Sequence, residues 1–136
     1  MVDDNGMGLL ARKAVLEELG YRVTTVGTPQ EALDRLSQGS FDLLITDYKL
    51  PGMTGGELIK KLQKQGSTIP VILLSGFVDA LGLDESNTGA DVVLQKSAHE
   101  VNHMVRSVKS LLRRAVVLKK PPASQKAKSA AARKKA

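Results

Sequence analysis

The chain has 136 residues, a length typical of one domain with its own hydrophobic core. It contains no cysteine and two histidines, which excludes disulfides, thiolate metal sites and a multi-histidine metal centre. No apolar stretch approaches the roughly 20 residues of a membrane helix, and the first residues are acidic where a secretory signal would be basic, so we expect a soluble, cytoplasmic protein.

The formal net charge of +6 is unevenly distributed. Seven of the 20 basic residues lie beyond position 114, where there is no acid, which leaves 13 basic residues against 14 acids in the rest of the chain. From position 119 onward the sequence consists mainly of Lys, Ala, Ser and Pro, and such a segment cannot bury enough surface to fold. We therefore predict a domain over residues 1–118 and a disordered basic tail over residues 119–136. The tail could bind anions weakly, including nucleic acid without sequence preference, an anionic membrane surface or an acidic protein.

Short apolar runs alternate with amphipathic stretches along residues 1–114, a pattern typical of βα units around a parallel sheet. The predicted strands are residues 1–3, 21–26, 42–47, 70–75 and 91–94. The predicted helices are residues 8–19, one starting at Thr28, one starting at Thr54, an interrupted one over 79–88, and 98–114. The runs 43–45 and 71–74 are continuously apolar, so we expect these two strands to be covered on both faces.

Three helix starts carry a capping signal, because Thr28, Thr54 and Ser97 each precede a glutamate by three residues. Gly20 is placed to end the first helix in the left-handed conformation. One apolar stripe runs along the last helix and predicts its buried face: Val101, Met104, Val105, Val108, Leu111 and Leu112.

Polar side chains follow most of the predicted strands. Asp3 and Asp4 end the first strand, Asp47 ends the third, and Ser75 and Lys96 follow the fourth and fifth. Parallel strands place their carboxyl ends along one edge, so these five side chains can converge. Three carboxylates repel one another unless a cation lies among them, and oxygen-only ligands favour Mg²⁺. Asp47 could then attack an activated phosphoryl group, Lys96 could neutralise its oxygens, and the Ser75 hydroxyl could turn toward it.

Four segments carry a family resemblance: Val2-Asp-Asp-Asn5, Ile45-Thr-Asp-Tyr-Lys-Leu-Pro-Gly-Met-Thr-Gly55, Val71-Ile-Leu-Leu-Ser-Gly76, and Gly89-Ala90 followed by Lys96. In this order they resemble a response-regulator receiver domain, a CheY-like domain of two-component signalling, over residues 1 to about 114. The resemblance implies an α/β fold of the flavodoxin-like class, a (βα)5 doubly wound parallel sheet with strand order 2-1-3-4-5.

The resemblance also implies a function. The chain would be a phosphoacceptor switch of a two-component phosphorelay, with Asp47 phosphorylated in the presence of Mg²⁺ by a sensor histidine kinase or a phosphotransfer protein, and an unknown protein downstream. Asp4, Asp47 and the backbone carbonyl of Lys49 would ligate Mg²⁺, and Asp3 would act through water. Ser75 and Lys96 would hold the phosphoryl group. Such a protein phosphorylates and dephosphorylates itself but is not an enzyme with ordinary turnover.

The sequence departs from the family pattern in four ways. The first strand is short, with two residues before Asp3, and we expect no effector domain after the receiver. Ser97 stands where a proline in a cis bond usually follows the lysine, and because a non-proline cis bond costs about 2.5–4 kcal/mol we expect a trans bond. Val93 replaces the aromatic residue that usually reports phosphorylation.

Other interpretations remain open. A degenerate receiver could act as a constitutive interaction module with a basic anion-binding tail. An aspartyl-phosphate phosphatase of the haloacid dehalogenase type would want an acid at position 49, where there is a lysine. Asp47 could start a turn, one of Asp3 and Asp4 could cap a helix, and Ser75 and Lys96 could be ordinary polar residues. For His99 and His103, one turn apart, we expect a solvated helix face.

Overall fold

The computed structural model describes residues 1–3, 5–97 and 99–119, with the backbone alone for 114–119. Its elements are α1 (Gly6–Glu18), α2 (Pro29–Gln38), β1 (Leu44–Asp47), α3 (Gly55–Lys64), β2 (Val71–Ser75), α4 (Val78–Leu81), α5 (Glu85–Thr88), β3 (Val92–Gln95) and α6 (Glu100–Lys119). Of the tail predicted over 119–136, Lys119 is instead the last residue of α6, and residues 120–136, like Asp4, lie outside the described residues. No helix in the described part of the chain is long and apolar enough to cross a membrane.

The sheet is parallel, and β2 lies between β1 and β3. Two further segments extend it beyond β1, because Val2 forms parallel bridges with both Val26 and Thr46. Val2 donates its N–H to the Ile45 carbonyl at 2.8 Å and accepts from the Asp47 N–H at 2.8 Å. The order across the sheet is therefore the predicted 2-1-3-4-5. The first predicted strand, 1–3, is held by bridges at Val2, since three residues are too few for a longer ladder, and the second, 21–26, has isolated bridge residues in place of a continuous strand.

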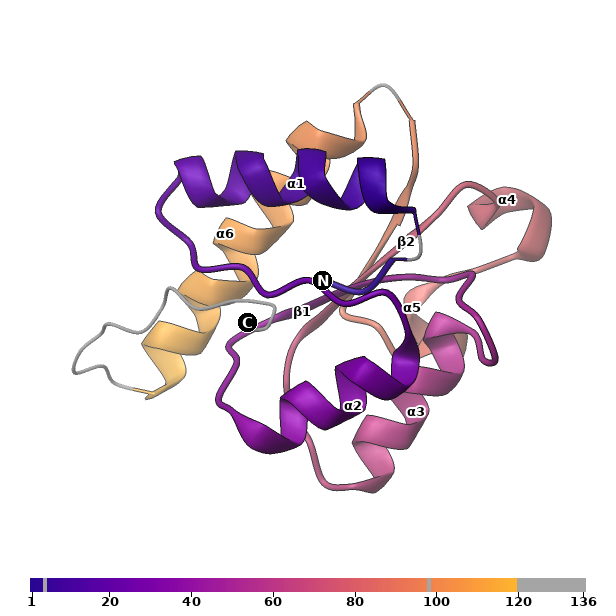
Figure 1. The fold of residues 1–136 in the computed structure, drawn as a ribbon, viewed down its shortest axis with the longest axis horizontal. Helices are drawn as coiled ribbons and strands as arrows, with labels where there is room; N and C mark the ends of the chain where they lie inside the picture. Colours follow the sequence, from indigo (N-terminus) through magenta and orange to yellow (C-terminus); the bar gives the residue numbers. More distant parts are fainter. Residues whose placement is uncertain (4, 98, 120–136) are drawn as a thin grey trace.

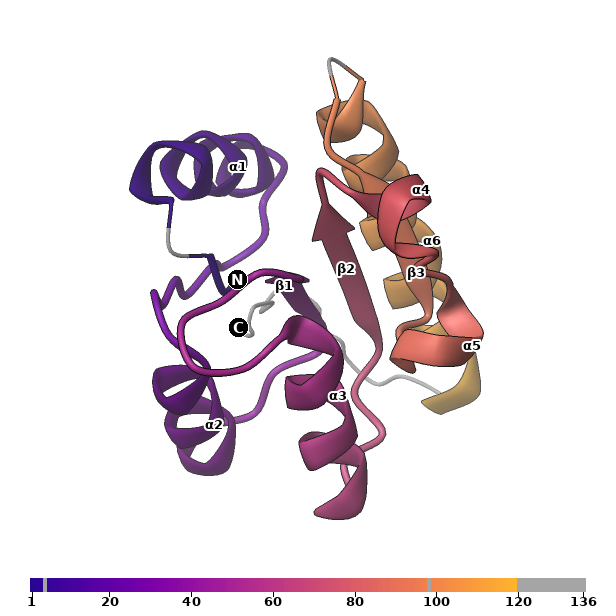
Figure 2. The ribbon, with the colours of Figure 1, turned by 90° about the vertical axis from the view of Figure 1, so that its right-hand side faces the viewer.

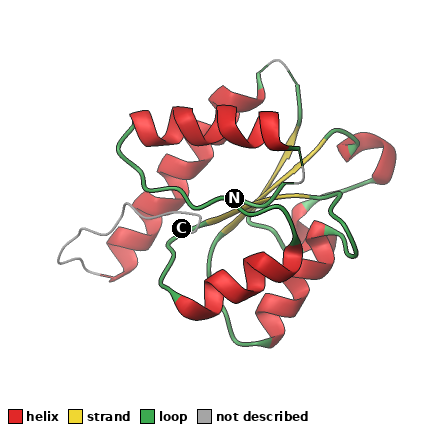
Figure 3. Cartoon of the chain, in the orientation of Figure 1, coloured by secondary structure: helices red, strands yellow, loops and turns green. Residues whose placement is uncertain are grey.

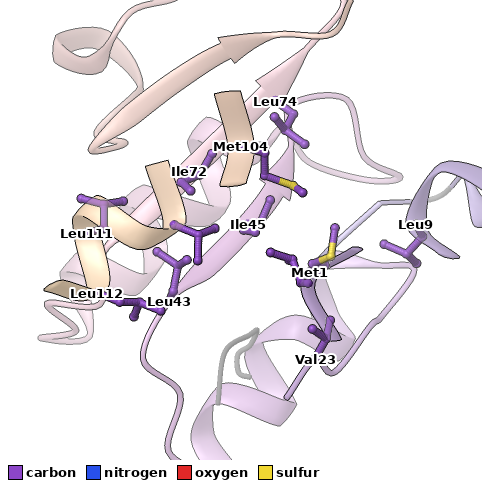
Figure 4. Close-up of a cluster of buried hydrophobic side chains, with 12 residues drawn as sticks. Met1, Leu9, Val23, Leu43, Ile45, Ile72, Leu74, Met104, Leu111 and Leu112 are labelled. Atoms are coloured by element: carbon purple, nitrogen blue, oxygen red, sulfur yellow. The ribbon is translucent and has the colours of Figure 1, made fainter. Parts of the chain in front are cut away.

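Helices cover both faces of this sheet (Figures 1 and 3), as the continuously apolar runs predicted. Side chains alternate along the strands, so Ile45, Ile72 and Leu74 point to one face and Leu44, Val71 and Leu73 to the other. The first face packs against α1 and α6, and Figure 4 shows Met104 of α6 among its strand residues. The second face packs against α2 and α3.

The helix ends confirm part of the capping prediction. Thr54 forms a complete capping box with Glu57, Thr28 accepts from the Glu31 N–H, and Gly20 has a φ of +98° after α1. The box predicted at Ser97 is wrong, because Ser97 Oγ accepts from the His99 N–H while the Glu100 carboxylate binds elsewhere. The cap of α1 is Asn5, not Asp3.

The segment predicted as one interrupted helix over 79–88 forms two short helices instead, α4 and α5. Gly82 ends α4 with a φ of +64°, and Asp84 then caps α5 with its own capping box. Figure 2 shows both beside β3, at the edge of the sheet. The β3 side chains are half-buried or exposed, whereas every residue of β1 and β2 is buried.

Candidate functional site

Asp47 lies at the carboxyl end of β1 and is buried, with 7% of its surface exposed. The backbone around it is tightly fixed. Tyr48 donates its N–H to the Leu74 carbonyl at 2.8 Å, and Gly55 donates to the Tyr48 carbonyl at 2.6 Å. A Cβ at Gly55 would collide with the Asp47 carbonyl oxygen and lie 2.8 Å from Leu73 Cδ1. Glycine is therefore required where α3 starts against the strand end.

Lys96 follows β3 and reaches the Asp47 carboxylate. Its N–H donates to the Ser75 carbonyl at 2.8 Å, which anchors the lysine beside the end of β2. Its Nζ lies 2.8 Å from Asp47 Oδ1 and 3.5 Å from Asp3 Oδ2. No peptide bond between described residues is cis, so the bond from Lys96 to Ser97 is trans as expected. The structure thus brings Asp3, Asp47 and Lys96 together from three separate parts of the chain.

Opposing effects act on the Asp47 carboxyl. Burial raises its pKa above the ordinary value, because the charged form loses its hydration. The hydrogen bond from Lys96 lowers the pKa, the neighbouring charge of Asp3 raises it, and the charge of Arg12 lowers it. The rise is the net result.

A buried ion-pair chain stabilises the first acid of the site. Arg12, in α1, donates from Nη1 to Asp3 Oδ2 at 2.9 Å and from Nε to Glu100 Oε2 at 2.7 Å. The other Asp3 oxygen, Oδ1, accepts from the Asn5 N–H at 2.9 Å. Arg12 thereby joins α1 directly to α6 and also to the first segment of the sheet.

Sequence reasoning missed Arg12 and Glu100, although a signal for Arg12 was present. Leu9, Arg12 and Leu16 are the buried residues of α1, and their spacing of three and four is that of one helix face. A charged residue within such an apolar stripe must be paired when buried. The sequence could therefore have indicated a buried partner for Arg12, though not which acids supply it.

The remaining predicted residues lie around this centre. Ser75 is buried, and its Oγ accepts from the Phe77 N–H at 3.0 Å. Lys49 is exposed, with Nζ 5.6 Å from the centre of the Phe77 ring, while its carbonyl as a metal ligand stays a prediction. His103 is exposed on α6 and His99 is exposed just before its first residue, with their ring centres 6.5 Å apart.

Asp3 and Asp47 have the chemistry to hold a cation. Both carboxylates approach the single ammonium group of Lys96, so oxygens from two separate segments of the chain lie around one positive charge. Oxygen donors of this kind suit Mg²⁺, which needs one or two carboxylates and keeps several waters. Among the described residues no group of three or more potential ligands is gathered, and Asp4, the third predicted carboxylate, lies outside them.

Comparison with known proteins identifies the family. Residues 1–109 match the model of the response regulator receiver domain. The chain therefore belongs to the response regulator receiver domain family, as its sequence motifs predicted. It is 29% identical over 116 residues to the transcriptional regulatory protein FixJ of Bradyrhizobium diazoefficiens, a match that covers 85% of this chain and 56% of FixJ. The chain thus corresponds to little more than half the length of that relative.

Solved receiver domains share the fold. The receiver domain of the Francisella response regulator 1452 is 28% identical, with a TM-score of 0.76 over 84% of this chain and 94% of that one. The response regulator TrrA from Thermotoga maritima, solved in complex with Mg²⁺ and BeF, is 30% identical, with a TM-score of 0.71 over 81% of this chain and 94% of that one. The flavodoxin-like α/β class predicted from the sequence is thereby confirmed.

Proposed function

We propose that this receiver domain is a phosphoacceptor switch of a two-component phosphorelay in which Asp47 receives the phosphoryl group. The observation that supports this most strongly is the buried Asp47 carboxylate, held at the end of β1 with Lys96 Nζ 2.8 Å away. Burial removes water that would compete for the donor, and the lysine supplies a positive charge next to the nucleophile. A sensor histidine kinase or a phosphotransfer protein is the proposed donor, and the cytoplasm the proposed compartment.

The reaction forms one bond and breaks one. An Asp47 carboxylate oxygen attacks the phosphorus of a phosphohistidine, and the bond between phosphorus and the imidazole nitrogen breaks, with its electron pair going to the nitrogen. Lys96 neutralises the oxygens of the transferred group, and the Ser75 hydroxyl donates to one of them. Water then hydrolyses the acyl phosphate to inorganic phosphate and the free Asp47 carboxylate, which resets the switch.

Asp3, Asp4, Asp47 and the Lys49 carbonyl would hold Mg²⁺ in this proposal. When bound, the metal would supply positive charge to the phosphoryl oxygens in the transition state. Asp3 contributes a carboxylate that Arg12 and Asn5 already orient. Asp47 would contribute a carboxylate oxygen as well as serve as the nucleophile.

Beryllofluoride binding tests the proposal, because this anion mimics a phosphoryl group on a carboxylate. Backbone amide NMR spectra in MgCl₂ should change around Asp47 when beryllofluoride is added to the wild type, and should not change for Asp47→Asn. The matched control is Asp79→Asn, which alters an exposed acid in α4 and should behave like the wild type. Equal changes in Asp47→Asn and the wild type would refute Asp47 as acceptor, and no change in either would favour a constitutive interaction module.

A further inference from the structure

Arg12 is a buried cation within the candidate site that the proposed phosphoryl transfer does not use. It is 6% exposed, and its guanidinium contacts carboxylates on both sides, Asp3 at 2.9 Å and Glu100 at 2.7 Å. An arginine remains charged in any protein environment. A full positive charge is therefore fixed beside Asp3, whatever else binds there.

The contacts of Asp3 leave neither of its oxygens free. Oδ1 accepts from the Asn5 N–H at 2.9 Å, and Oδ2 faces both Arg12 Nη1 at 2.9 Å and Lys96 Nζ at 3.5 Å. If a metal ion binds Asp3, directly or through water, two protein cations already offset the negative charge of that carboxylate. The second cation, Lys96, also contacts Asp47, whereas the contacts of Arg12 are to Asp3 and Glu100.

Neighbouring residues of α1 fix the position of the Arg12 guanidinium. Gly8 lies one turn before Arg12, and a Cβ there would lie 3.2 Å from Arg12 Nη1 and 3.6 Å from Nη2. The glycine therefore leaves room for the side chain to run back along the helix toward Asp3. Leu9 and Leu16 bury the same helix face on either side of it.

We propose that Arg12 is a positioning residue that acts as a built-in counter-cation: it orients Asp3, offsets its charge in the metal-free protein, and so weakens the affinity of the site for Mg²⁺. This inference rests on the proposed function, because it takes Asp3 and Asp47 as part of a Mg²⁺ site. Its physical basis is that a fixed positive charge repels a divalent cation at short range through a medium less polar than water. Mg²⁺ binding and the Arg12 charge are thus antagonistic.

The test measures Mg²⁺ affinity with the metal alone, without a phosphoryl donor. Amide NMR titrations with MgCl₂, at ionic strength kept constant with NaCl, give the dissociation constant for the wild type, Arg12→Met and Arg12→Lys. Arg12→Met should bind Mg²⁺ at least about fivefold more tightly, the lower end of typical coupling between sites. Arg12→Lys keeps the charge, and its affinity should stay closer to that of the wild type than to that of Arg12→Met.

Thermal unfolding supplies an independent readout. Arg12→Met should unfold at a lower temperature than the wild type without metal, because Asp3 and Glu100 lose a buried partner. Added MgCl₂ should raise its unfolding temperature by more than it raises that of the wild type, since tighter binding to the folded state stabilises it more. Folding of Arg12→Met only in the presence of Mg²⁺ would support the proposal in the strongest form.

A second pair of variants decides the matter if Arg12→Met does not fold at any Mg²⁺ concentration. The double variant Arg12→Met with Glu100→Gln leaves no Glu100 carboxylate unpaired, and it should bind Mg²⁺ more tightly than Glu100→Gln alone. The inference would be overturned if removal of Arg12, in whichever background folds, left the affinity for Mg²⁺ unchanged or made it weaker. Equal Mg²⁺ affinities of Arg12→Lys and Arg12→Met would also overturn it.

Failure of this inference can be told apart from failure of the proposed function. A wild type that binds Mg²⁺ and beryllofluoride, with an affinity for Mg²⁺ that does not respond to Arg12, would refute the role of Arg12 alone. A wild type that binds neither would refute both.

Discussion

The centre of the sheet and its β3 edge are stabilised in different ways. Strands β1 and β2 are buried along their whole length, and their carboxyl ends meet a chain of buried ion pairs through Asp3, Arg12 and Lys96. Strand β3, at the edge, is half-buried. Its neighbours Phe77 and Leu81 expose 54% and 55% of their surface.

Polar side chains hold much of the β3 edge in place. The Val93 N–H donates to the Glu85 carboxylate at 3.0 Å, and Gln95 accepts from the Val78 N–H at 3.1 Å while donating to the Gly76 carbonyl at 2.8 Å. These hydrogen bonds are exposed to water, which competes for them and lowers their net contribution to about 1 kcal/mol each. The carboxyl ends of β1 and β2 around Asp47 therefore tolerate little structural change. The β3 edge, which would report phosphorylation, can change its conformation at a small cost in free energy.

Two leucines that pair across the sheet give the largest expected contrast. Leu74 in β2 pairs with Leu94 in β3, and the first is 1% exposed while the second is partly buried. Leu74→Ala should lower the free energy of unfolding by about 2–5 kcal/mol, the cost of a cavity in a core. Leu94→Ala should lower it by less than half as much, since fewer contacts are lost. Denaturant unfolding measures both, and equal losses would mean that the β3 edge is as firmly packed as the centre.

Two adjacent glycines, Gly55 and Gly56, extend this comparison to the carboxyl end of β1, where Asp47 lies. Gly55→Ala would push a methyl group into the Asp47 carbonyl oxygen and against Leu73, so we expect a loss of about 1–3 kcal/mol in unfolding free energy. Gly56→Ala places its Cβ at an ordinary 3.6 Å from Tyr48 Cε1 and should be neutral, or stabilise α3 by up to about 1 kcal/mol. If Gly55→Ala proved as stable as Gly56→Ala, the backbone around Asp47 would be looser than we describe.

The smallest expected effect is the pH dependence of Asp47. Because burial raises the pKa of this carboxyl in the folded protein, its ionisation disfavours folding as pH rises through that pKa. In metal-free buffer, Asp47→Asn should therefore unfold at a higher temperature than the wild type at pH 7. The advantage should vanish as pH falls below the ordinary value near 3.8, where the carboxyl is protonated in both states. Thermal unfolding across pH measures this, and a variant less stable than the wild type at pH 7 would show that the ion pair with Lys96 outweighs burial.

Much of the fold was predictable because its determinants are local in the sequence. The apolar runs before Asp47 and Ser75 specified strands covered on both faces, and the capping box at Thr54 specified a helix start. The helix predicted over 79–88 is interrupted at Gly82 as expected, but the interruption is complete, because Gly82 adopts the left-handed conformation and Asp84 starts a second helix. The end of one helix and the cap of the next lie only two residues apart, so composition alone did not show where the second helix begins.

The site was predictable only in part. Parallel topology alone brought Asp3, Asp47 and Lys96 to one edge, so their convergence followed from the order of the strands. The pairing of Arg12 with Glu100, 88 positions apart, depends on how α1 and α6 pack on the same face, which no local pattern encodes. The local pattern of Ser97 and Glu100 predicted a capping box for the same reason, but in the structure the Glu100 carboxylate binds Arg12 instead.

The central claim is that Asp47 accepts a phosphoryl group, and intact-mass measurement tests it most directly. Wild type and Asp47→Asn are incubated with acetyl phosphate and MgCl₂, and the intact mass of each protein is then measured by mass spectrometry. We predict a gain of one phosphoryl mass in the wild type that is lost when MgCl₂ is replaced by EDTA, and no gain in Asp47→Asn. A wild type that gains no mass, or an Asp47→Asn variant that gains as much, would contradict the account.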